Sequence, residues 1–359
     1  MRNRIERLQQ VLKQQEVDCA VFGPTNNMLY LLGGMSHPDE RLCLLMVTPD
    51  GVQLLSPKLN ADIFASFTDI PMITWEDAQG PDSALAASLL GKGSIHTLAT
   101  DGSMRADFLL AALKTCGPED IVSAEPVVAA LRVVKSPGEI EALARAALQA
   151  DKAMQAAADA CKPGATEAEV AWAAEEAFRS DGAERVEFTL VASGINGAFP
   201  HHNTGEKRLE EGEGIIIDIG ASMKGYKSDI TRVVFLGNPN SEFLEAYELV
   251  RKANAAGRKA VRPGVRAEEI DRATRSVIEE AGMGQFFIHR TGHGLGLDVH
   301  EEPWIQAGNT TSVEEGMVFS VEPGVYVPGR FGIRVEDIVA ATSGGCRTLT
   351  GFDHSLIVK

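Results

Sequence analysis

The chain has 359 residues, a length that predicts two domains at about 150 residues each. Its composition, 44% hydrophobic and 23% charged, excludes disordered, collagen-like and membrane-spanning proteins. Because 50 acidic residues outnumber 34 basic residues and give a net charge of −16, we expect neither nucleic acid nor an anionic membrane as a partner.

The amino-terminal segment predicts a compact α/β domain. Its first residues are polar and lack the apolar core of a secretory signal, so we expect a cytosolic protein. Residues 5–12 place apolar side chains on one helical face. Farther on, the apolar run 42–47 turns at Pro49-Asp50-Gly51 into residues 52–55, which indicates a hairpin.

A break in the pattern predicts the domain boundary. Helical and strand patterns alternate up to about residue 130, where Lys135-Ser136-Pro137-Gly138 interrupts them and a helix over Glu139–Cys161 begins. We therefore place the boundary near residue 132, which gives domains of residues 1–132 and 133–359.

The second domain contains an internal repeat. Residues 162–182 match residues 262–282 at an offset of 100, and in each a Pro-Gly pair precedes a helix that ends at glycine. Farther on, Asp218 and Glu322 follow a Glu-Gly pair at the same interval. The repeat predicts a pseudo-twofold α+β domain whose halves each present acids to a shared centre.

In the first half, one buried strand carries a single acid. Residues 214–220 contain only Asp218 as a charged residue, and residues 228–235 form the partner strand across a turn at 223–225. Folding about that turn places Asp218 opposite Asp229. Directly opposed side chains lie about 4.5–5.5 Å apart, so two buried carboxylates there require a cation between them.

The second half repeats this arrangement. The strand 318–322 turns at Pro328-Gly329-Arg330, and folding about Gly329 places Glu322 opposite Glu336. Arg334 shares the face of Glu336 and offsets part of the negative charge. The two hairpins together favour a cation site rather than two solvated sheet edges.

Histidines add nitrogen donors to these acids. His293 lies in the glycine-rich segment 291–296, where the backbone approaches its neighbours closely and directs the imidazole. His201 and His300 are further neutral acid/base candidates. Four carboxylates and an imidazole suit two divalent ions such as Mn²⁺, Co²⁺ or Zn²⁺. Such a pair lowers the pKa of a bound water and polarises a carbonyl, so the implied reaction is hydrolysis.

A set of short motifs occurs together between residues 200 and 337. They are Pro200-His201, Asp218, Ser228-Asp229-Ile230-Thr231, Gly292-His293-Gly294, Val299-His300-Glu301, Val321-Glu322-Pro323-Gly324 and Arg334-Val335-Glu336-Asp337. With them the chain resembles the pita-bread metallopeptidases, and among these the proline-specific branch of Xaa-Pro dipeptidase (prolidase) and short-form aminopeptidase P. The resemblance implies a creatinase-like amino-terminal domain, a pita-bread catalytic domain and a homodimer.

The resemblance also implies a role for each metal-site residue. Asp218 would bind the first ion, His293 and Glu322 the second, and Asp229 and Glu336 would bridge the two. All these positions are filled, which argues against the metal-free relatives of the family and against a non-catalytic module that binds peptides or proteins.

The remaining roles concern the reaction and its substrate. Glu322 would move protons, while His201 and His300 would position the substrate and stabilise the tetrahedral intermediate. We favour an Xaa-Pro dipeptidase, with aminopeptidase P acting on longer peptides as the alternative. Phe352-Asp353-His354 has no clear counterpart in the family.

A loop in the first domain is the candidate for telling dipeptides from longer peptides. Residues 33–41 begin with glycines and end in charges, as in loops that reach over clefts. Arg41 would bind the carboxylate of a proline after the scissile bond, and Asp39 would orient Arg41 or meet the substrate amine. Arg334 is a further candidate for substrate binding.

Overall fold

The computed structural model describes residues 2–359. Its contacts divide the chain into two compact units, one that ends at Arg132 and one that begins at Val133. None of the helices in the described chain combines the length and the apolar character that a membrane crossing needs.

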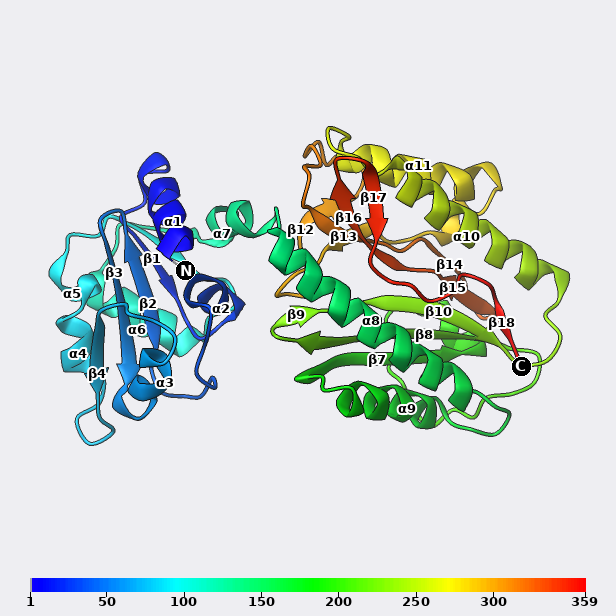
Figure 1. The fold of residues 1–359 in the computed structure, drawn as a ribbon, viewed down its shortest axis with the longest axis horizontal. Helices are drawn as coiled ribbons and strands as arrows, with labels where there is room; N and C mark the ends of the chain where they lie inside the picture. The colour runs from blue at the N-terminus through cyan, green and yellow to red at the C-terminus, as the bar shows by residue number, and fades with distance from the viewer. Residues whose placement is uncertain (1) are drawn as a thin grey trace. The chain divides into compact units, whose positions relative to one another are not determined.

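The first unit is built on a six-stranded mixed sheet of order β4-β3-β2-β1-β5-β6 (Figure 1). Its strands are β1 (Cys19–Phe22), β2 (Leu44–Thr48), β3 (Gly51–Pro57), β4 (Met72–Trp75), β5 (Thr97–Thr100) and β6 (Asp120–Ser123). Its helices are α1 (Arg2–Gln14), α2 (Asn26–Leu32), η1 (Lys58–Asn60), α3 (Ala61–Ala65), α4 (Asp82–Ala86), α5 (Leu89–Lys92), α6 (Ala106–Cys116) and α7 (Glu125–Arg132). The predicted α/β architecture is confirmed.

Two local patterns explain how this unit forms. Ile5, Leu8 and Leu12 lie on one face of α1 and are buried, as the helical spacing predicts. Thr48 pairs with Gly51, so β2 and β3 form the predicted hairpin around Pro49 and Asp50.

The second unit consists of two helix pairs and three sheets. Its helices are α8 (Pro137–Ala160), α9 (Glu167–Ser180), η2 (Gly194–Ala198), α10 (Ser241–Ala260), α11 (Ala267–Glu280) and η3 (Gly284–Phe286). Its strands are β7 (Arg185–Ser193), β8 (Gly214–Met223), β9 (Tyr226–Lys227), β10 (Ile230–Phe235), β11 (Gly292–Gly294), β12 (Glu301–Ile305), β13 (Val318–Val321), β14 (Gly324–Val327), β15 (Phe331–Arg334), β16 (Asp337–Thr342), β17 (Gly345–Thr348) and β18 (Ile357–Val358). The sheets have the orders β18-β10-β8-β7 with β9 on β8, β12-β11-β13-β16-β17, and β14-β15.

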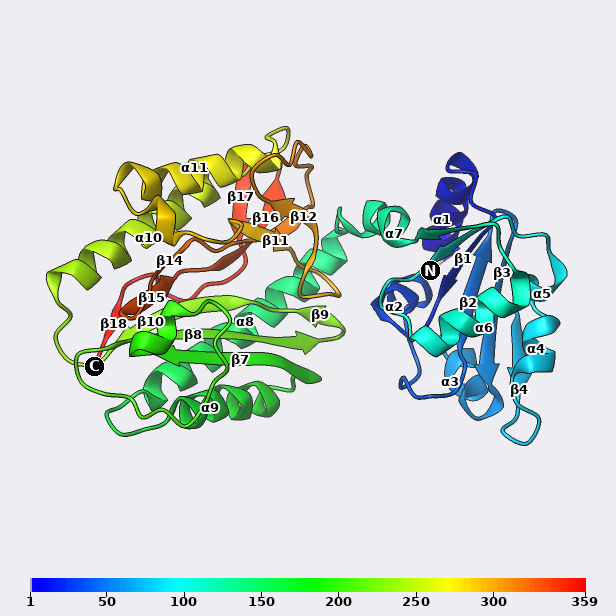
Figure 2. The same ribbon diagram turned by 180° about the vertical axis from the view of Figure 1, so that it is seen from behind.

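The alternation of side chains along β8 decides which residues face the centre of this unit. Ile215, Ile217 and Ile219 pack against α8 and α9. Ile216 faces the other way and packs with residues of α10, β14 and β15. In Figure 2, β14 and β15 lie between α10 on one side and β10 and β8 on the other. Asp218 lies two residues after Ile216, so its side chain points to the same face of β8, toward β15 and between the two halves of the unit.

The helix pairs reproduce the predicted repeat. Helices α9 and α11 have the same length and lie 100 residues apart. Each follows a glycine of positive φ, Gly164 (φ 86) or Gly264 (φ 87). Helix α8 begins at Pro137, two residues before the predicted start, because Ser136 caps it and proline is tolerated in the first turn.

Candidate metal centre and active site

The first hairpin corrects one prediction. Asp218 pairs with Thr231 and not with Asp229, because Lys224 (φ 52) and Gly225 (φ 81) form a two-residue turn that closes directly after Met223. The register is therefore shifted by two residues from the predicted one. Two residues are one full period of a strand, so Asp218 and Asp229 still lie on the same face.

The second hairpin has the predicted register. On one side of the two acids Val321 pairs with Asp337, and on the other side Gly324 pairs with Arg334. Both pairs belong to the same register, which places Glu322 opposite Glu336. The chain turns at Gly329, whose φ is 70. The residue Glu336 also bridges to Thr231 of β10, so this backbone contact joins the acids of the two halves.

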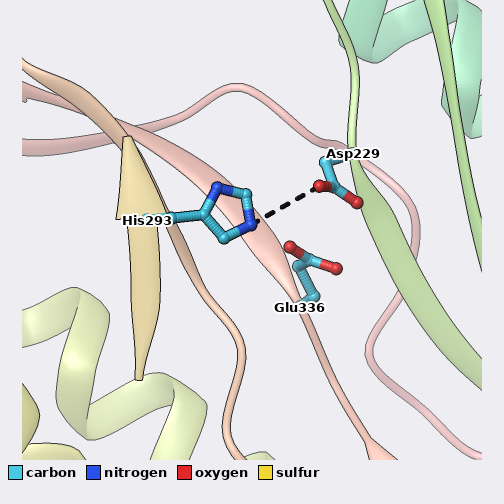
Figure 3. A group of neighbouring side chains, drawn as sticks. All are labelled: Asp229, His293 and Glu336. Carbon is cyan, nitrogen blue, oxygen red and sulfur yellow. Dashed lines mark ion pairs between the residues drawn. The ribbon is translucent and has the colours of Figure 1, made fainter. Parts of the chain in front are cut away.

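Three buried side chains from different strands converge on one point (Figure 3). Asp229 precedes β10, His293 lies in β11 and Glu336 lies between β15 and β16. Each offers a ligand atom, and these atoms lie within 4.8 Å of one another. The Nε2 atom of His293 is 3.7 Å from Oδ2 of Asp229 and 3.2 Å from Oε1 of Glu322.

The ring of His293 is held in the orientation that a metal ligand needs. Its Nδ1 lies 3.0 Å from the carbonyl oxygen of Gly294, which can only accept, so Nδ1 carries a proton and Nε2 faces the acids. The flanking glycines allow this packing. A Cβ atom on Gly292 would lie 1.9 Å from the carbonyl oxygen of Ser320, and one on Gly294 would lie 2.1 Å from that of Glu302.

The acids repel one another strongly without a cation. Burial and the charges of neighbouring carboxylates raise the pKa values of Asp229 and Glu336 well above their ordinary values. Burial also raises the pKa of Glu322, but the hydrogen bond and charge of His293 outweigh it and lower that pKa to about 2. One buried oxygen of Asp218 and one of Glu336 have no hydrogen-bond partner among residues 2–359. Carboxylates and imidazole are ligands of divalent ions, so these residues fit a metal site.

Arg334 links the two halves of the cluster but leaves most of its negative charge uncompensated. Its Nη2 donates to Oδ2 of Asp218 (2.6 Å), and its Nε donates to Oγ1 of Thr231 (3.1 Å). The same hydroxyl donates to Oε2 of Glu336 (2.7 Å). One guanidinium cannot neutralise four acids. These contacts hold the site together, and the predicted role of Arg334 toward substrate stays a prediction.

The sequence-based analysis missed two residues behind Arg334. The hydroxyl of Tyr326 accepts from Nη1 of Arg334 (2.7 Å) and lies 3.0 Å from Nε2 of His289. The Nδ1 of His289 donates to the carbonyl oxygen of Arg290 (2.7 Å), so its Nε2 accepts the tyrosine proton. Burial raises the pKa of Tyr326 to about 12 and lowers that of His289. No sequence signal identifies them, because His289 lies in the loop before β11 and its contact with Tyr326 forms only in the folded domain.

A cavity of about 930 Å³ in the second unit is lined by the whole cluster and by His201 and His300. Both histidines are accessible to solvent at the cavity that they line. The ring of His300 lies 4.2 Å from that of His293. Burial, followed by the charges of His293 and Arg290, lowers the pKa of His300 to about 4, so this ring is neutral at pH 7.

A buried carboxylate positions the loop that carries His201. Glu167 accepts hydrogen bonds from Ser193 and Asn196 and lies 2.9 Å from Nε2 of His202. The side chain of Glu167 is fully buried. This network gives His202 a structural role.

In the first-domain loop, Arg41 contacts two acids. Its backbone N–H donates to Oδ1 of Asp39 (2.9 Å), and its Nη1 donates to Oδ2 of Asp39 (3.3 Å). The guanidinium binds both oxygens of Asp77, with Nε at 3.0 Å and Nη2 at 3.1 Å. Neither Arg41 nor Asp39 is among the residues that line the 930 Å³ cavity. Their contact with substrate stays a prediction.

Comparison with known proteins gives the same domain types along nearly the whole chain. Residues 141–343 match metallopeptidase family M24, and residues 4–134 match the creatinase/prolidase N-terminal domain. The probable dipeptidase PepE of Mycobacterium tuberculosis is 38% identical over 344 residues, which cover 94% of this chain and 91% of that protein. The Xaa-Pro dipeptidase of Pyrococcus horikoshii is 31% identical over 358 residues, 99% of each chain. The prolidase structure from Thermococcus sibiricus superposes with a TM-score of 0.94 at 34% identity, covering 100% of this chain and 99% of that one.

Proposed function

Because the chain belongs to metallopeptidase family M24 and is a metal-dependent peptidase, we propose that it hydrolyses the bond before proline in Xaa-Pro dipeptides. The observation that carries the proposal is a single cavity lined by the candidate metal ligands together with His201 and His300. Relatives named Xaa-Pro dipeptidase and prolidase match the chain over its length and support the same substrate class.

The residues of the cluster would hold two divalent ions, Mn²⁺, Co²⁺ or Zn²⁺. Asp218 would bind one ion, His293 and Glu322 the other, and Asp229 and Glu336 both. The raised pKa values of Asp229 and Glu336 and the unpartnered oxygens support this assignment. When bound, the ions would supply a water of lowered pKa and a Lewis acid for the carbonyl before proline.

The protein groups around the ions have separate tasks. Glu322 would accept a proton and pass it to the leaving nitrogen. His300 is neutral and donates a hydrogen bond to the oxygen on which negative charge develops. His201, in the turn that follows η2, would hold the substrate. Ser320 donates to Oε1 of Glu322 (3.0 Å) and sets the direction of this carboxylate.

Aminopeptidase P activity on longer peptides is the alternative, because the metal cluster surrounds the scissile bond and does not contact residues beyond the proline. A non-catalytic peptide-binding module is the second alternative, and metal-dependent turnover would exclude it. Under the dipeptidase assignment, Arg41 of the same or a partner subunit would bind the carboxylate of the proline, and Asp39 would orient Arg41 or meet the substrate amine. We also propose a homodimer, which light scattering would measure.

The test compares three substrates on one preparation. Protein stripped of metal and then given Mn²⁺, Co²⁺ or Zn²⁺ is assayed with Ala-Pro, Ala-Pro-Ala and Ala-Ala. We expect hydrolysis only with metal, fastest for Ala-Pro and slowest for Ala-Ala. Faster cleavage of Ala-Pro-Ala would assign the protein to aminopeptidase P. Equal cleavage of Ala-Ala would remove the preference for proline.

A further inference from the structure

Lys135 is a buried lysine at the start of the second unit, two residues before α8. Its side chain is 2% exposed, and its Nζ donates to Oε1 of Glu301 (2.8 Å) and to the carbonyl oxygen of Val133 (3.2 Å). Its backbone N–H donates to the carbonyl oxygen of Gly316 (2.9 Å). Both the backbone and the ammonium group of Lys135 are therefore fixed within the second unit.

The acid that Lys135 binds lies next to a proposed catalytic residue. Glu301 directly follows His300, which lines the cavity. The carboxylate of Glu301 turns back onto the loop 295–300, where its Oε2 accepts from the N–H of Asp298 (3.4 Å). A Cβ atom on Gly296 would lie 2.6 Å from Oε1, so glycine is needed for this close approach. The side chain of Glu301 therefore closes the loop whose last residue is His300.

A second set of contacts joins the start of α8 to the same loop. The hydroxyl of Tyr226 in β9 donates to Oε1 of Glu139 (2.9 Å), in the first turn of α8. The next backbone N–H, of Lys227, donates to the carbonyl oxygen of Gly296 (2.9 Å). The loop is thus connected to the beginning of the second unit through β9 as well as through Glu301.

The position of the Lys135–Glu301 pair excludes a direct part in the reaction. Neither residue is among those that line the cavity. A buried ion pair also does little for stability, because removing two charges from water often costs more than their attraction returns. An effect of the pair on turnover must therefore pass through the neighbouring residue, His300, whose ring lies 4.2 Å from that of His293.

We propose that Lys135 is a positioning residue, which through its ion pair with Glu301 fixes the loop 295–300 and holds the ring of His300 where it stabilises the tetrahedral intermediate. This inference rests on the proposed function, since it assigns a task at the same site. Misplacing a group by about 1 Å can cost about 10²-fold in rate. The proposed metal ligands lie outside this loop, so the pair acts on turnover and not on metal binding.

The experiment breaks the pair from each side. Lys135→Met removes the charge of the lysine, Lys135→Arg keeps it, and Glu301→Gln removes the opposite charge while preserving the size of the side chain. Glu301→Gln provides the same comparison if Lys135→Met does not fold. Lys152→Met is the matched control, because Lys152 on α8 forms an exposed pair of similar length with Asp181 (2.7 Å).

For each protein loaded with Mn²⁺, kcat and KM for Ala-Pro are measured together with metal content and thermal unfolding. The same substitutions are repeated in a His300→Ala background. We expect Lys135→Met and Glu301→Gln each to lower kcat by about 10- to 100-fold, with KM and metal content near those of the unmodified protein. Lys135→Arg should retain most of the turnover and Lys152→Met all of it.

The His300→Ala background separates positioning from a general structural role. Once the ring is absent there is nothing left to position, so adding Lys135→Met should change kcat by no more than about twofold. A substitution that only loosened the fold would instead add its full effect to that of His300→Ala.

The ring of His300 also gives a readout that does not depend on the substrate. In protein loaded with diamagnetic Zn²⁺, the NMR signals of its ring C–H groups are assigned by their loss in His300→Ala. These signals should move in Lys135→Met and in Glu301→Gln, and they should stay in place in Lys152→Met.

The inference is wrong if Lys135→Met and Glu301→Gln keep full turnover, or if their losses follow metal content or thermal unfolding. Full additivity with His300→Ala, or unchanged ring signals in both variants, would also overturn it. If the unmodified, metal-loaded protein does not cleave Ala-Pro, the proposed function fails. Ring signals that still move in Lys135→Met would then support the positioning of His300 for another reaction.

Discussion

Arg232 and Asp337 form an ion pair of 2.9 Å in which the side chains are 1% and 0% exposed. Each directly follows a residue of the bridge that joins the two halves, Thr231 and Glu336. The guanidinium also donates to the carbonyl oxygens of Thr231 (2.9 Å) and Glu336 (2.6 Å). The pair therefore fixes the backbone immediately behind the metal cluster.

The carboxyl-terminal segment packs around the Arg232–Asp337 pair. This packing gives a structural role to Phe352-Asp353-His354, the motif without a clear counterpart in the family. Arg232 donates to the carbonyl oxygens of Phe352 (2.7 Å) and Asp353 (3.0 Å). Nε2 of His354 lies 2.7 Å from Oδ2 of Asp337. Burial raises the pKa of Asp337, but the His354 hydrogen bond and the charge of Arg232 outweigh it and lower the pKa below its ordinary value.

We predict that Arg232→Met strongly destabilises the protein, because it leaves Asp337 buried without its main counter-charge. Breaking one side of a buried pair typically costs about 3–5 kcal/mol. Denaturant unfolding in a metal chelator measures the free energy of unfolding, and titration with Mn²⁺ measures the accompanying loss of metal affinity. Arg330→Met, which breaks an exposed pair with Glu242, is the control and should have a much smaller effect. Equal effects of the two substitutions would contradict the prediction.

We predict that Asp229→Ala loses metal and activity together. Asp229 is one of the two residues proposed to bind both ions, and removing it leaves Glu336 and Asp218 without the cation that compensates them. Elemental analysis and turnover of Ala-Pro should fall in parallel. Full turnover by thoroughly metal-stripped protein would show that the ions are not needed.

His300→Ala should separate metal binding from turnover. The histidine is proposed to stabilise the transition state and not to hold metal, so metal content should remain near that of the unmodified enzyme. Loss of one such donor typically lowers turnover by ~10²–10³. If metal content fell in proportion to activity, His300 would be a ligand and the proposed division of roles would be wrong.

The metal-free protein should become less stable as the pH rises above the ordinary pKa values of carboxyl and imidazole groups. The pKa values of Asp229 and Glu336 are raised in the folded state, so their contribution to stability is present while they are protonated and is lost as the pH passes those values. Acids with lowered pKa values, such as Glu322, are ionised throughout this range and contribute no slope. Divalent metal competes with protons, so Mn²⁺ affinity should rise over the same range. Thermal unfolding with and without Mn²⁺ tests both trends, and a flat metal-free profile would contradict them.

The sequence by itself determined the two-domain order, the internal repeat and the acids that meet. These features depend on local periodicity and on hairpin turns, in which residues close in sequence become neighbours in space. Even the wrong register at Asp218 left this acid on the correct face, because an error of two residues equals one strand period. The spacing of glycines around His293 likewise indicated a close backbone approach, which Ser320 and Glu302 confirm.

Only the tertiary structure decided which residues support the cluster from a distance. Tyr326 of β14 contacts Arg334, and His289, in the loop before β11, contacts Tyr326. Arg232 joins β10 to the carboxyl-terminal segment more than 100 residues later. Such contacts leave no periodic signal, since each forms where two independently folded segments pack.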